Sequence, residues 1–523
     1  MTWEPEVEEI ERRKRLAYQM GGEERVRDQH ARGKLTARER IDGLIDAGSW
    51  RERGVLGGSA TYDGVDLKEF MPKRTVYGLG RIDGRPVVVS ADDFTARPGS
   101  GSAGERGGRG GEGLGPRGPD QMALHFKLPC VRLIDGFGGD IRAVAGLNRT
   151  YIPEMSIQST VAMLNEVPLA AAALGSVAGG PAAIATAAHF SVMVKGLSQV
   201  FAAGPPVVRR ALGVDVTKEE LGGYQIHTRK SGVIDNEAED EADAFRQIRA
   251  FLSYLPSSVH ELPPASPCDD PPDRREEALL SFIPRNRNRP YNVRRLIDLI
   301  VDRGSAFELG RYFGGAQVTL FARLHGKPVG ILANDPLIYG GSMDAAAAQK
   351  AEKFIELCDQ FSLPIVNLAD QPGFLIGVGA ESAGTLKHGM RLFTAMEYLH
   401  VPWATVIVRR LYGVAGAAHQ SHSRWNYRIA WPSGEWGSLP VEGGVAAAYR
   451  REIEAAADPA AYAAELEARL AAMRSPFRTA EALNIEDLVD PRDTRPLLCE
   501  WADLAYEKRL PTILGPKTRG MRP

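Results

Sequence analysis

The sequence predicts an α/β protein organised as a tandem duplication, with parallel strands alternating with helices in each half. Val167–Gly180 (VPLAAAALGSVAGG) is a long apolar run that ends in glycine, which is typical of a strand covered on both faces. The pattern returns as Val401–Gly416, and helical patterns separate the predicted strands in both halves. Because strand and helix alternate, we expect parallel pairing.

Three segments of the first half match three segments of the second half in the same order. The pairs are Gly84–Asp93 with Gly326–Asp335, Leu128–Asp135 with Leu363–Asp370, and Val167–Gly180 with Val401–Gly416. The separation between the two members is nearly constant from pair to pair. Such spacing indicates a repeated fold unit, with chance similarity of apolar strands as the alternative. Two copies of one fold predict two related pockets.

The acidic, proline-rich stretch Ser257–Asp273 is the predicted linker between the copies. We therefore expect a first domain over residues 1–257, a linker over 258–275 and a second domain over 276–523. The 523-residue length suits two domains of ordinary size.

Composition argues against several classes of protein. The 64 Lys and Arg residues nearly balance the 66 Asp and Glu residues, so no overall field attracts nucleic acid or an anionic membrane. The four cysteines lie far apart without a CxxC pair, which argues against a zinc ribbon or a disulfide framework, and we expect no metal. No apolar run approaches bilayer length and Met1–Glu11 lacks the apolar region of a signal peptide, so we expect a cytoplasmic protein.

Helices are predicted near the start of the chain. Glu6–Val26 is charged and helix-prone, and Thr36 with Glu39 forms a capping box ahead of an apolar stripe that reaches Ile45. The basic residues around this second helix are Arg32, Lys34, Arg38 and Arg40. We expect them to form a solvated face, with a phosphate site as the alternative.

The remainder of the first half alternates strands, loops and helices. A strand over Asp83–Asp93 precedes residues 97–119, a Gly/Arg-rich stretch without periodicity that we expect to be a loop; RNA binding is a minor alternative. Val192–Leu197 is predicted to be a strand. Thr217–Leu221 carries a second capping box, and Asp240–Tyr254 reads as an amphipathic helix.

The second half shows clearer helices. Asp344 is predicted to cap a helix whose apolar face runs from Ala348 to Cys358, ahead of the strand Leu363–Asp370. A further helix is predicted from about Glu381. Its expected sheet-facing residues are Leu386, Met390, Phe393 and Met396.

Familiar catalytic motifs are absent, and the chemistry must come from elsewhere. The sequence has no P-loop, no G-x-S-x-G and no H-E-x-x-H, and His227, His388 and His419 each stand alone, as structural or solvated histidines do. What recurs is a glycine turn at a strand end. Such turns present backbone N–H groups, which can stabilise an oxyanion such as a thioester enolate.

Several motifs together resemble the carboxyltransferase (β) subunits of biotin-dependent acyl-CoA carboxylases, such as propionyl-CoA and acetyl-CoA carboxylase. They are Arg32–Ile41 (RGKLTARERI), Val192–Gly196 (VMVKG), Thr217–Gly223 (TKEELGG), Pro372–Leu375 (PGFL) and Ala430–Pro432 (AWP) before Glu442–Gly444. The resemblance covers nearly the whole chain. It implies two crotonase-like domains and a homo-hexamer whose active sites combine the amino-terminal domain of one subunit with the carboxyl-terminal domain of another.

The resemblance also implies roles for individual residues. The amides of Gly179 and Gly180 match the oxyanion hole for the acyl-CoA thioester, and those of Val414 and Ala415 match the hole for the ureido oxygen of biotin. The implied substrate-binding residues are Gly138, Gly139, Arg142, Ala178, Ala183, Gly413, Gly416 and Ala417. The implied biotin-binding residues are Pro372, Gly373 and Phe374.

By this resemblance, carboxybiotin releases CO2 in a closed site, the ureido nitrogen takes the α-proton and the enolate attacks CO2, with no side-chain base or metal. The chain has neither an EAMKM-like biotinylation site nor a recognisable ATP-grasp segment. We therefore expect an α subunit that carries the biotin carboxylase and the biotin carboxyl carrier. We expect no nucleic acid or membrane partner.

The chain departs from the family pattern in three places. The turn Asp135–Arg142 (DGFGGDIR) replaces an SGGAR-like turn, and the loop 97–119 replaces a helix-forming stretch. Ala183 stands where the family commonly has Tyr, and Gly416–Ala417 stands where it has Tyr-Asp. Because these changes remove bulk and a charge, we expect a roomier pocket for an acyl chain longer or more branched than propionyl. Refilling of the space by a shifted backbone is the alternative.

Two other functions remain open at this point. The same fold serves the carboxyltransferases of sodium-pumping decarboxylases and transcarboxylases, which would run the reaction toward biotin. A non-catalytic assembly protein could also keep the fold, because the loops are altered. A test of whether the protein binds any acyl-CoA distinguishes the assembly protein from the two enzymes.

Overall fold

The computed structural model describes residues 2–96, 118–138, 150, 157–419, 425–471, 473–517 and 520–522. All but the last two residues of the predicted loop 97–119 lie outside these ranges. The chain divides into two compact units, Met1–Val259 with Gly520–Pro523, and His260–Arg519. Most of the predicted linker belongs to the second unit, where Ser266 N donates to Gly326 O at 3.0 Å.

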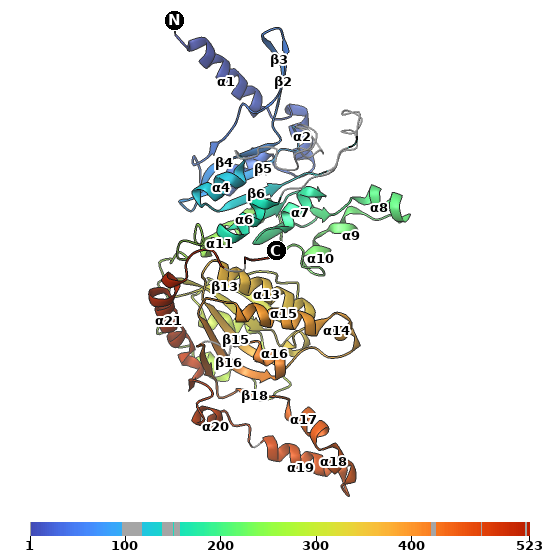
Figure 1. Cartoon of the computed structure of the whole chain (residues 1–523), viewed down its shortest axis with the longest axis vertical. Coiled ribbons are helices and arrows are strands. Elements are labelled where there is room, and N and C mark those ends of the chain that lie inside the picture. Colours follow the sequence, from blue (N-terminus) through green and yellow to red (C-terminus); the bar gives the residue numbers. More distant parts are fainter. Residues whose placement is uncertain are drawn as a thin grey trace. The chain divides into compact units, whose positions relative to one another are not determined.

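The first unit is built on a seven-stranded sheet with the order β1-β4-β5-β6-β7-β9-β11. Three neighbouring strands of this sheet, β4, β5 and β6, are labelled in Figure 1. β1, β4 and β5 are antiparallel neighbours, and the strands from β5 to β11 pair in parallel. Two small sheets, β2-β3 and β8-β10, stand apart. The strands are β1 (Arg51–Glu52), β2 (Gly58–Asp63), β3 (Asp66–Pro72), β4 (Thr75–Ile82), β5 (Arg85–Asp92), β6 (Cys130–Ile134), β7 (Leu169–Ala173), β8 (Ser176–Ala178), β9 (Phe190–Val194), β10 (Gln199–Phe201) and β11 (Asn236–Ala238).

The second unit repeats this topology with the order β12-β13-β14-β15-β16-β17-β19, and β18 also pairs with β16. Again two antiparallel pairings precede a run of parallel ones. The strands are β12 (Phe307–Glu308), β13 (Gln317–Leu324), β14 (Lys327–Asn334), β15 (Ile365–Gln371), β16 (Trp403–Tyr412), β17 (Tyr427–Ala430), β18 (Glu435–Gly437) and β19 (Asp487–Leu488).

The duplication is confirmed at the level of single residue pairs. Val88, Cys130 and Leu169 are paired neighbours in the first sheet, and Gly330, Ile365 and Trp403 are paired neighbours in the second. Each of the first three is separated from its counterpart by the same distance along the chain as the matching sequence segments. The register therefore survives in both copies, because a slip by one residue would turn buried side chains toward the opposite face.

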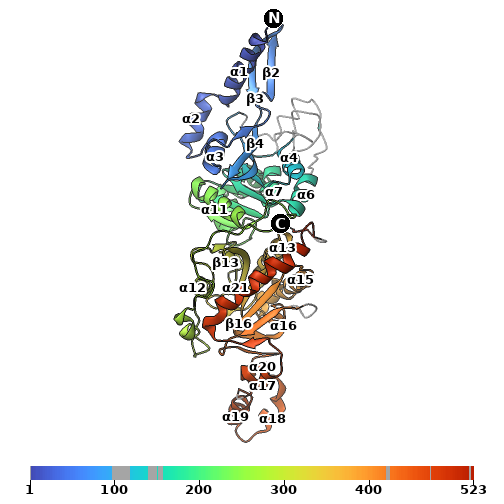
Figure 2. The same ribbon diagram turned by 90° about the vertical axis from the view of Figure 1, so that its left-hand side faces the viewer.

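Helices cover both faces of the first sheet (Figure 2). On one face Phe251 of α11 stacks on Phe190 of β9, and α3 packs beside α11; α4, α6 and α7 pack on the other face. The helices are α1 (Glu4–Tyr18), α2 (Glu23–Ala31), α3 (Ala37–Leu44), α4 (Pro119–Phe126), α6 (Gln158–Glu166), α7 (Gly180–Thr186), α8 (Pro205–Leu212), α9 (Lys218–Gly222), α10 (Tyr224–His227) and α11 (Glu241–Tyr254).

The second sheet is covered in the same manner. α12 and α21 pack on one face through Leu296 and Trp501, and α13 packs on the other, where Cys358 leaves room only for glycine at position 330. The helices are α12 (Val293–Ile300), α13 (Ala345–Gln360), α14 (Val378–Ser382), α15 (Thr385–Glu397), α16 (Gly413–Ala417), α17 (Val441–Ala448), α18 (Arg450–Ala455), α19 (Pro459–Ala471), α20 (Pro476–Glu481) and α21 (Thr494–Leu504). In the part of the chain that the structure describes, no helix is long and apolar enough to cross a bilayer.

The predicted helix starts are confirmed. Thr36 and Thr217 each form a capping box with the Glu three residues later, at the starts of α3 and α9. Asp240 and Asp344 accept hydrogen bonds from the first-turn amides of α11 and α13. A side-chain acceptor at this position satisfies an N–H that has no partner within the helix.

The helix-prone stretch Glu6–Val26 is helical as predicted, in α1 and α2. Two other predictions about elements are wrong. Val167–Gly180 forms two strands, because β8 leaves the main sheet and pairs with β10. In α15 the buried residues are Thr385, Gly389, Leu392, Ala395 and Met396. Leu386 and Met390 are instead 58 % and 44 % exposed. Apolar residues occupy two sides of this helix, so periodicity alone does not identify the buried one.

Candidate functional site

The predicted site residues of the first unit lie where two parallel strands end. Gly138 follows β6, and Gly179 and Gly180 follow β7 and β8. Phe137 forms a bridge with Ala178, and Gly138 N donates to Ala178 O at 3.0 Å. The two turns are therefore joined through their backbones, as expected for ligand sites at the carboxyl ends of parallel strands.

The two amides predicted as the first oxyanion hole differ in their availability. Gly179 has φ 67° and its N–H donates to Phe201 O at 3.2 Å. Gly180 begins α7, and within the described residues no group accepts a hydrogen bond from its N–H. A side chain at Gly138 would place Cβ 2.9 Å from Gly180 N, so glycine at 138 lets the two turns approach. The N–H of Gly180 is the one that remains open to a ligand.

The second unit repeats this arrangement. Gly413 has φ 63° and opens α16, as Gly179 with φ 67° precedes α7. The repeat that pairs Val167 with Val401 also aligns Gly180 with Val414. Over the described ranges, no acceptor meets the N–H of Val414 or Ala415; Val414 is 54 % exposed and Ala415 is buried. Helix amides in a first turn have no intrahelical acceptor, so neither N–H group is satisfied within α16, and Val414 is the exposed one of the two.

The predicted biotin-binding turn lies beside α16. Pro372–Phe374 follows β15, and β15 and β16 are parallel neighbours that pair up to Gln371 and Leu411. The turn is held by Met343, whose N–H donates to Gly373 O at 3.0 Å. The strand order thus brings the turn and the start of α16 to the same edge of the sheet.

The other predicted site residues differ in their exposure, and two of them lie outside the described residues. Ala178 and Ala417 are half-buried, Ala183 is exposed and Gly416 is buried. Gly139 and Arg142 lie outside the described residues. The structure therefore brings Gly138 and Ala178 to the turn at Gly180, and Gly416 and Ala417 to the helix that Val414 begins.

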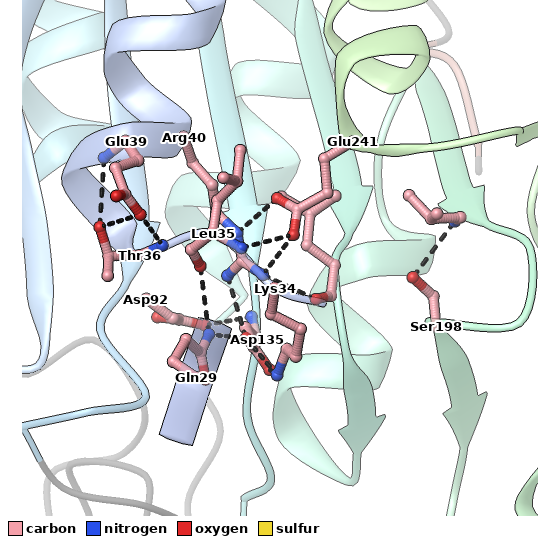
Figure 3. Close-up of polar contacts among 12 residues, drawn as sticks. Gln29, Lys34, Leu35, Thr36, Glu39, Arg40, Asp92, Asp135, Ser198 and Glu241 are labelled. Carbon is pink, nitrogen blue, oxygen red and sulfur yellow. Dashed lines mark hydrogen bonds and ion pairs between the residues drawn. The ribbon is translucent and has the colours of Figure 1, made fainter. Parts of the chain in front are cut away.

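Beneath the first turn lies a buried polar network that the sequence did not reveal (Figure 3). Asp135 accepts from Lys34 at 2.6 Å, from Arg40 at 3.0 Å and from Gln29 at 3.2 Å. Arg40 also donates to Glu241 at 2.7 and 3.0 Å and to Leu174 O. Lys34 and Arg40 are 9 % and 0 % exposed, so the expectation of a solvated face, or of phosphate binding, is wrong for both. Their charges are neutralised inside the protein.

A related arrangement supports the second turn. Asp370 accepts from Arg409 at 2.7 Å and from Arg410 at 2.6 Å, and the repeat that pairs Leu128 with Leu363 aligns it with Asp135. Asp135 directly follows β6 and Asp370 lies at the end of β15, and these are equivalent strands of the two units. A signal existed in the sequence, because the repeats LPCVRLID and LPIVNLAD both end in Asp.

The backbone of each buried aspartate is held in the same way. Asp135 N donates to Asp92 Oδ2 at 3.2 Å, and Asp370 N donates to Asn334 Oδ1 at 3.0 Å. Asp92 and Asn334 occupy equivalent positions of the repeated segments GRPVVVSADD and GKPVGILAND. Burial raises the pKa of Asp92 to about 6, whereas the amide of Asn334 does not titrate.

Of the three isolated histidines, His227 and His419 have structural partners, whereas the buried Nδ1 of His388 has none among the described residues. His227 Nε2 donates to Val200 O at 2.5 Å, next to the β10 residue whose carbonyl accepts from Gly179. His419 is buried, and burial lowers its pKa to about 4. Neither lies in a group of metal-binding side chains, since none was found among the described residues.

The chain matches known proteins over nearly its full length. The family description "Carboxyl transferase domain" matches residues 28–521. The propionyl-CoA carboxylase beta chain of Roseobacter denitrificans is 34% identical, covering 94% of each chain, and the methylmalonyl-CoA decarboxylase subunit alpha of Veillonella parvula is 33% identical, covering 94% of this chain and 93% of that one. The transcarboxylase 12S hexamer with methylmalonyl-coenzyme A bound matches with a TM-score of 0.85 and 31% identity, covering 97% of this chain and 96% of that one.

Proposed function

This chain belongs to the carboxyl transferase family of biotin-dependent acyl-CoA carboxyltransferases, and we propose that it is the subunit of an acyl-CoA carboxylase that moves the carboxyl group to the α-carbon. The observation that carries the proposal is the pair of strand-end turns with open amides. Gly180 in the first unit and Val414 in the second occupy equivalent positions, each at the start of a short helix. Two equivalent donors suit a reaction with two carbonyl-type oxygens.

In the first unit we assign the thioester oxygen of acyl-CoA to the N–H of Gly180. Loss of the α-proton converts the thioester carbonyl into an enolate, whose oxygen is negative. A backbone N–H at a helix start stabilises that charge more than it stabilises the neutral ester, so the barrier to enolate formation falls. The close approach of Gly138 fixes the donor in place.

In the second unit we assign the ureido oxygen of biotin to the amides of Val414 and Ala415. The site suits this group, because neither N–H group has an acceptor among the described residues and the turn Pro372–Phe374 lies at the adjacent strand end. Biotin supplies the carboxyl group and accepts the α-proton. The chain contributes hydrogen-bond donors that polarise the urea and hold it in orientation.

The acyl group is proposed to be larger than propionyl. Ala183 on α7 and Ala417 on α16 lie one turn beyond the open amides and have small side chains. A methyl group in place of a larger polar side chain leaves volume for an apolar chain.

We further propose a homo-hexamer that works with a biotin-carrying α subunit. The transcarboxylase 12S relative is a hexamer, and this chain matches it over 97% of its length. The sequence has no recognisable biotinylation site, which assigns the biotin to another subunit.

A second candidate is the carboxyltransferase of a decarboxylase or transcarboxylase, favoured by the match to a methylmalonyl-CoA decarboxylase subunit alpha. Both use the same turns, and the direction of carboxyl transfer in the complete complex separates them. A non-catalytic assembly protein with the same fold would not bind acyl-CoA.

The test uses the purified full chain, excess free biotin and malonyl-, methylmalonyl- and longer alkylmalonyl-CoA esters. We expect biotin-dependent loss of the carboxyl group, fastest with a longer alkylmalonyl ester. Without biotin the rate should fall to background. The chain alone, given acyl-CoA, ATP and bicarbonate, should form no product.

The outcomes separate the proposals. Activity greatest with methylmalonyl-CoA would contradict the larger acyl pocket and leave carboxyl transfer standing. No biotin-dependent reaction with any ester, although the esters bind, would contradict the proposed transferase. Absence of binding would favour the assembly protein.

A further inference from the structure

In the second unit, two side chains connect the two backbone segments of the proposed biotin site. His419 lies two residues after the end of α16, and its N–H donates to Gly416 O at 3.1 Å. Its Nε2 lies 3.0 Å from Gln371 Oε1, and Gln371 Nε2 donates to Gly373 O at 2.7 Å. A continuous bridge therefore runs from the end of α16 to the turn Pro372–Phe374.

The hydrogen-bond partners determine how both side chains are oriented. Gln371 Nε2 also donates to Gly341 O at 3.2 Å, so its Oε1 is left to accept from Asn334 at 2.8 Å and from His419. A neutral imidazole that carries its proton on Nε2 donates to Gln371, and its Nδ1 lies 3.1 Å from Asn367 Oδ1 on the other side of the ring. Burial favours this neutral ring at physiological pH.

His419 is anchored from below as well. Its carbonyl accepts from Thr405 Oγ1 at 2.8 Å and from Trp403 Nε1 at 3.1 Å, both on β16. The residue is 1 % exposed, so it has no space in which to rotate. The sheet thus holds His419 in place, and His419 in turn holds Gln371 through their hydrogen bond.

Within the described residues, the first unit has no equivalent bridge. The repeat alignment places Gly136 opposite Gln371 and Ala185 opposite His419, and neither has a polar side chain. There, the turn is joined to the next strand by the backbone bridge between Phe137 and Ala178.

A change in strand pairing explains the difference. The register of β15 against β16 shifts between Ala369 and Gln371. Such an irregularity interrupts the regular backbone ladder at the point where the site begins. Side chains hold the two segments together at that point.

We infer that His419 and Gln371 are positioning residues for biotin, setting the spacing between the turn Pro372–Phe374 and the amides of Val414 and Ala415. The inference rests on the proposed function of these segments. Neither side chain needs to touch the ligand, since each acts through the backbone it holds. A displacement of about 1 Å in such a site can cost about a hundredfold in rate.

The test compares His419→Leu and Gln371→Met, which remove the bridge at similar volume, with His419→Gln, which keeps a donor for Gln371. A matched control is His189→Leu in the first unit. His189 is also fully buried, accepts from Leu169 N and lies 3.0 Å from Leu164 O, and neither partner is a predicted site residue. Each full-length variant is assayed for biotin-dependent decarboxylation.

We expect kcat/KM for free biotin to fall about 10- to 100-fold in His419→Leu and Gln371→Met, with the Kd of the CoA ester unchanged. His419→Gln should retain most of the activity. The double variant should lose little more than either single variant, because both remove one bridge. His189→Leu should lower stability without a selective effect on biotin.

Hydrogen exchange measured by mass spectrometry gives a readout that does not require activity. Residues 372–375 and 413–417 should exchange faster in His419→Leu and Gln371→Met, and at the wild-type rate in His189→Leu. If these residues exchanged at the wild-type rate in His419→Leu and Gln371→Met, the inferred role of the bridge would be wrong, even if wild type were inactive. An inactive wild type with faster exchange in the variants would contradict the proposed function and keep the bridge. If His419→Leu does not fold, equal biotin kinetics in Gln371→Met and wild type would overturn the positioning role.

Discussion

Gly180 offers a direct way to remove a single backbone donor. It is the first residue of α7, a position where proline is tolerated because its missing N–H has no helical partner. A Cβ at this position would meet no atom within 4 Å. A Cβ is therefore accommodated, whereas the proline ring would also occupy the position of the N–H, on the side where Gly138 approaches.

We predict that Gly180→Pro lowers kcat for carboxyl transfer by about 10²- to 10³-fold, the cost of one oxyanion donor. Gly180→Ala is the matched control, since it keeps the N–H and has room for the methyl group. It should retain activity within a few-fold of wild type. Both variants are compared by decarboxylation kinetics after circular dichroism shows that they fold. Normal turnover by Gly180→Pro would show that the N–H of Gly180 is not an oxyanion donor in the reaction.

At the level of elements, buried charge links the helices of the first unit to the ends of its strands. Arg40 on α3 reaches Asp135 after β6 and Glu241 at the start of α11. Removing one partner would leave an uncompensated charge, which typically costs about 3–5 kcal/mol. The network thus makes the position of the glycine turn depend on the docking of two helices.

Asp92 gives this network a pH dependence that the second unit lacks at the equivalent Asn334. Its pKa is raised from the ordinary 3.8 to about 6, so its stabilising contribution is complete below about pH 4 and is lost as pH rises through 6. Asp92→Asn, which copies Asn334, should keep the hydrogen bond from Asp135 N and remove the titration. We predict that the unfolding free energy of Asp92→Asn, minus that of wild type, increases as pH rises from about 4 to about 7.

Urea unfolding at several pH values across that interval measures this difference. Asp63→Asn, at an exposed position on β2, is the control and should not reproduce the trend. A constant difference between Asp92→Asn and wild type throughout the interval would show that Asp92 titrates near its unfolded value.

At the scale of the whole molecule, exposed apolar side chains gather around the proposed biotin turn. Ile376 and Val378 are 86 % and 85 % exposed, and Leu386 and Met390 of α15 are also exposed. An apolar surface of this kind marks an interaction site in a monomer. Subunit contacts in the proposed hexamer would cover it.

We predict that the wild-type chain sediments at about six times 56.8 kDa. Leu386→Glu combined with Met390→Glu should shift it to smaller species, because a buried unpaired carboxylate opposes association. Analytical ultracentrifugation measures both, with Leu483→Glu as a control at another exposed apolar position. A monomeric wild type would contradict the hexamer; an intact hexamer in the double variant would place α15 outside its interfaces.

Much of the architecture followed from local patterns. Capping boxes at Thr36 and Thr217 depend on side chains three positions apart, so they can be recognised in the sequence alone. The repeats keep the same strand register in both units, because the pattern of buried side chains along each strand specifies how it pairs. The strand-end turns could be located for the same reason.

Availability of the amides could not be predicted in this way. Gly179 donates to Phe201 because β8 leaves the main sheet to join β10, a pairing between segments that α7 and β9 separate along the chain. The burial of Arg40 likewise depends on Asp135 and Glu241, which lie far away in the sequence. Basic residues on an amphipathic helix look solvated until the partner elements are placed.

By itself, therefore, the sequence determined the duplicated α/β fold and the positions of the two turns, because these depend on short-range periodicity and capping. The family resemblance rested on its motifs. Only the tertiary structure decided which N–H groups remain open, which charges are buried and that His419 joins Gln371. Those properties arise from contacts between distant segments, whose free energies are set by packing and solvent exclusion rather than by local sequence.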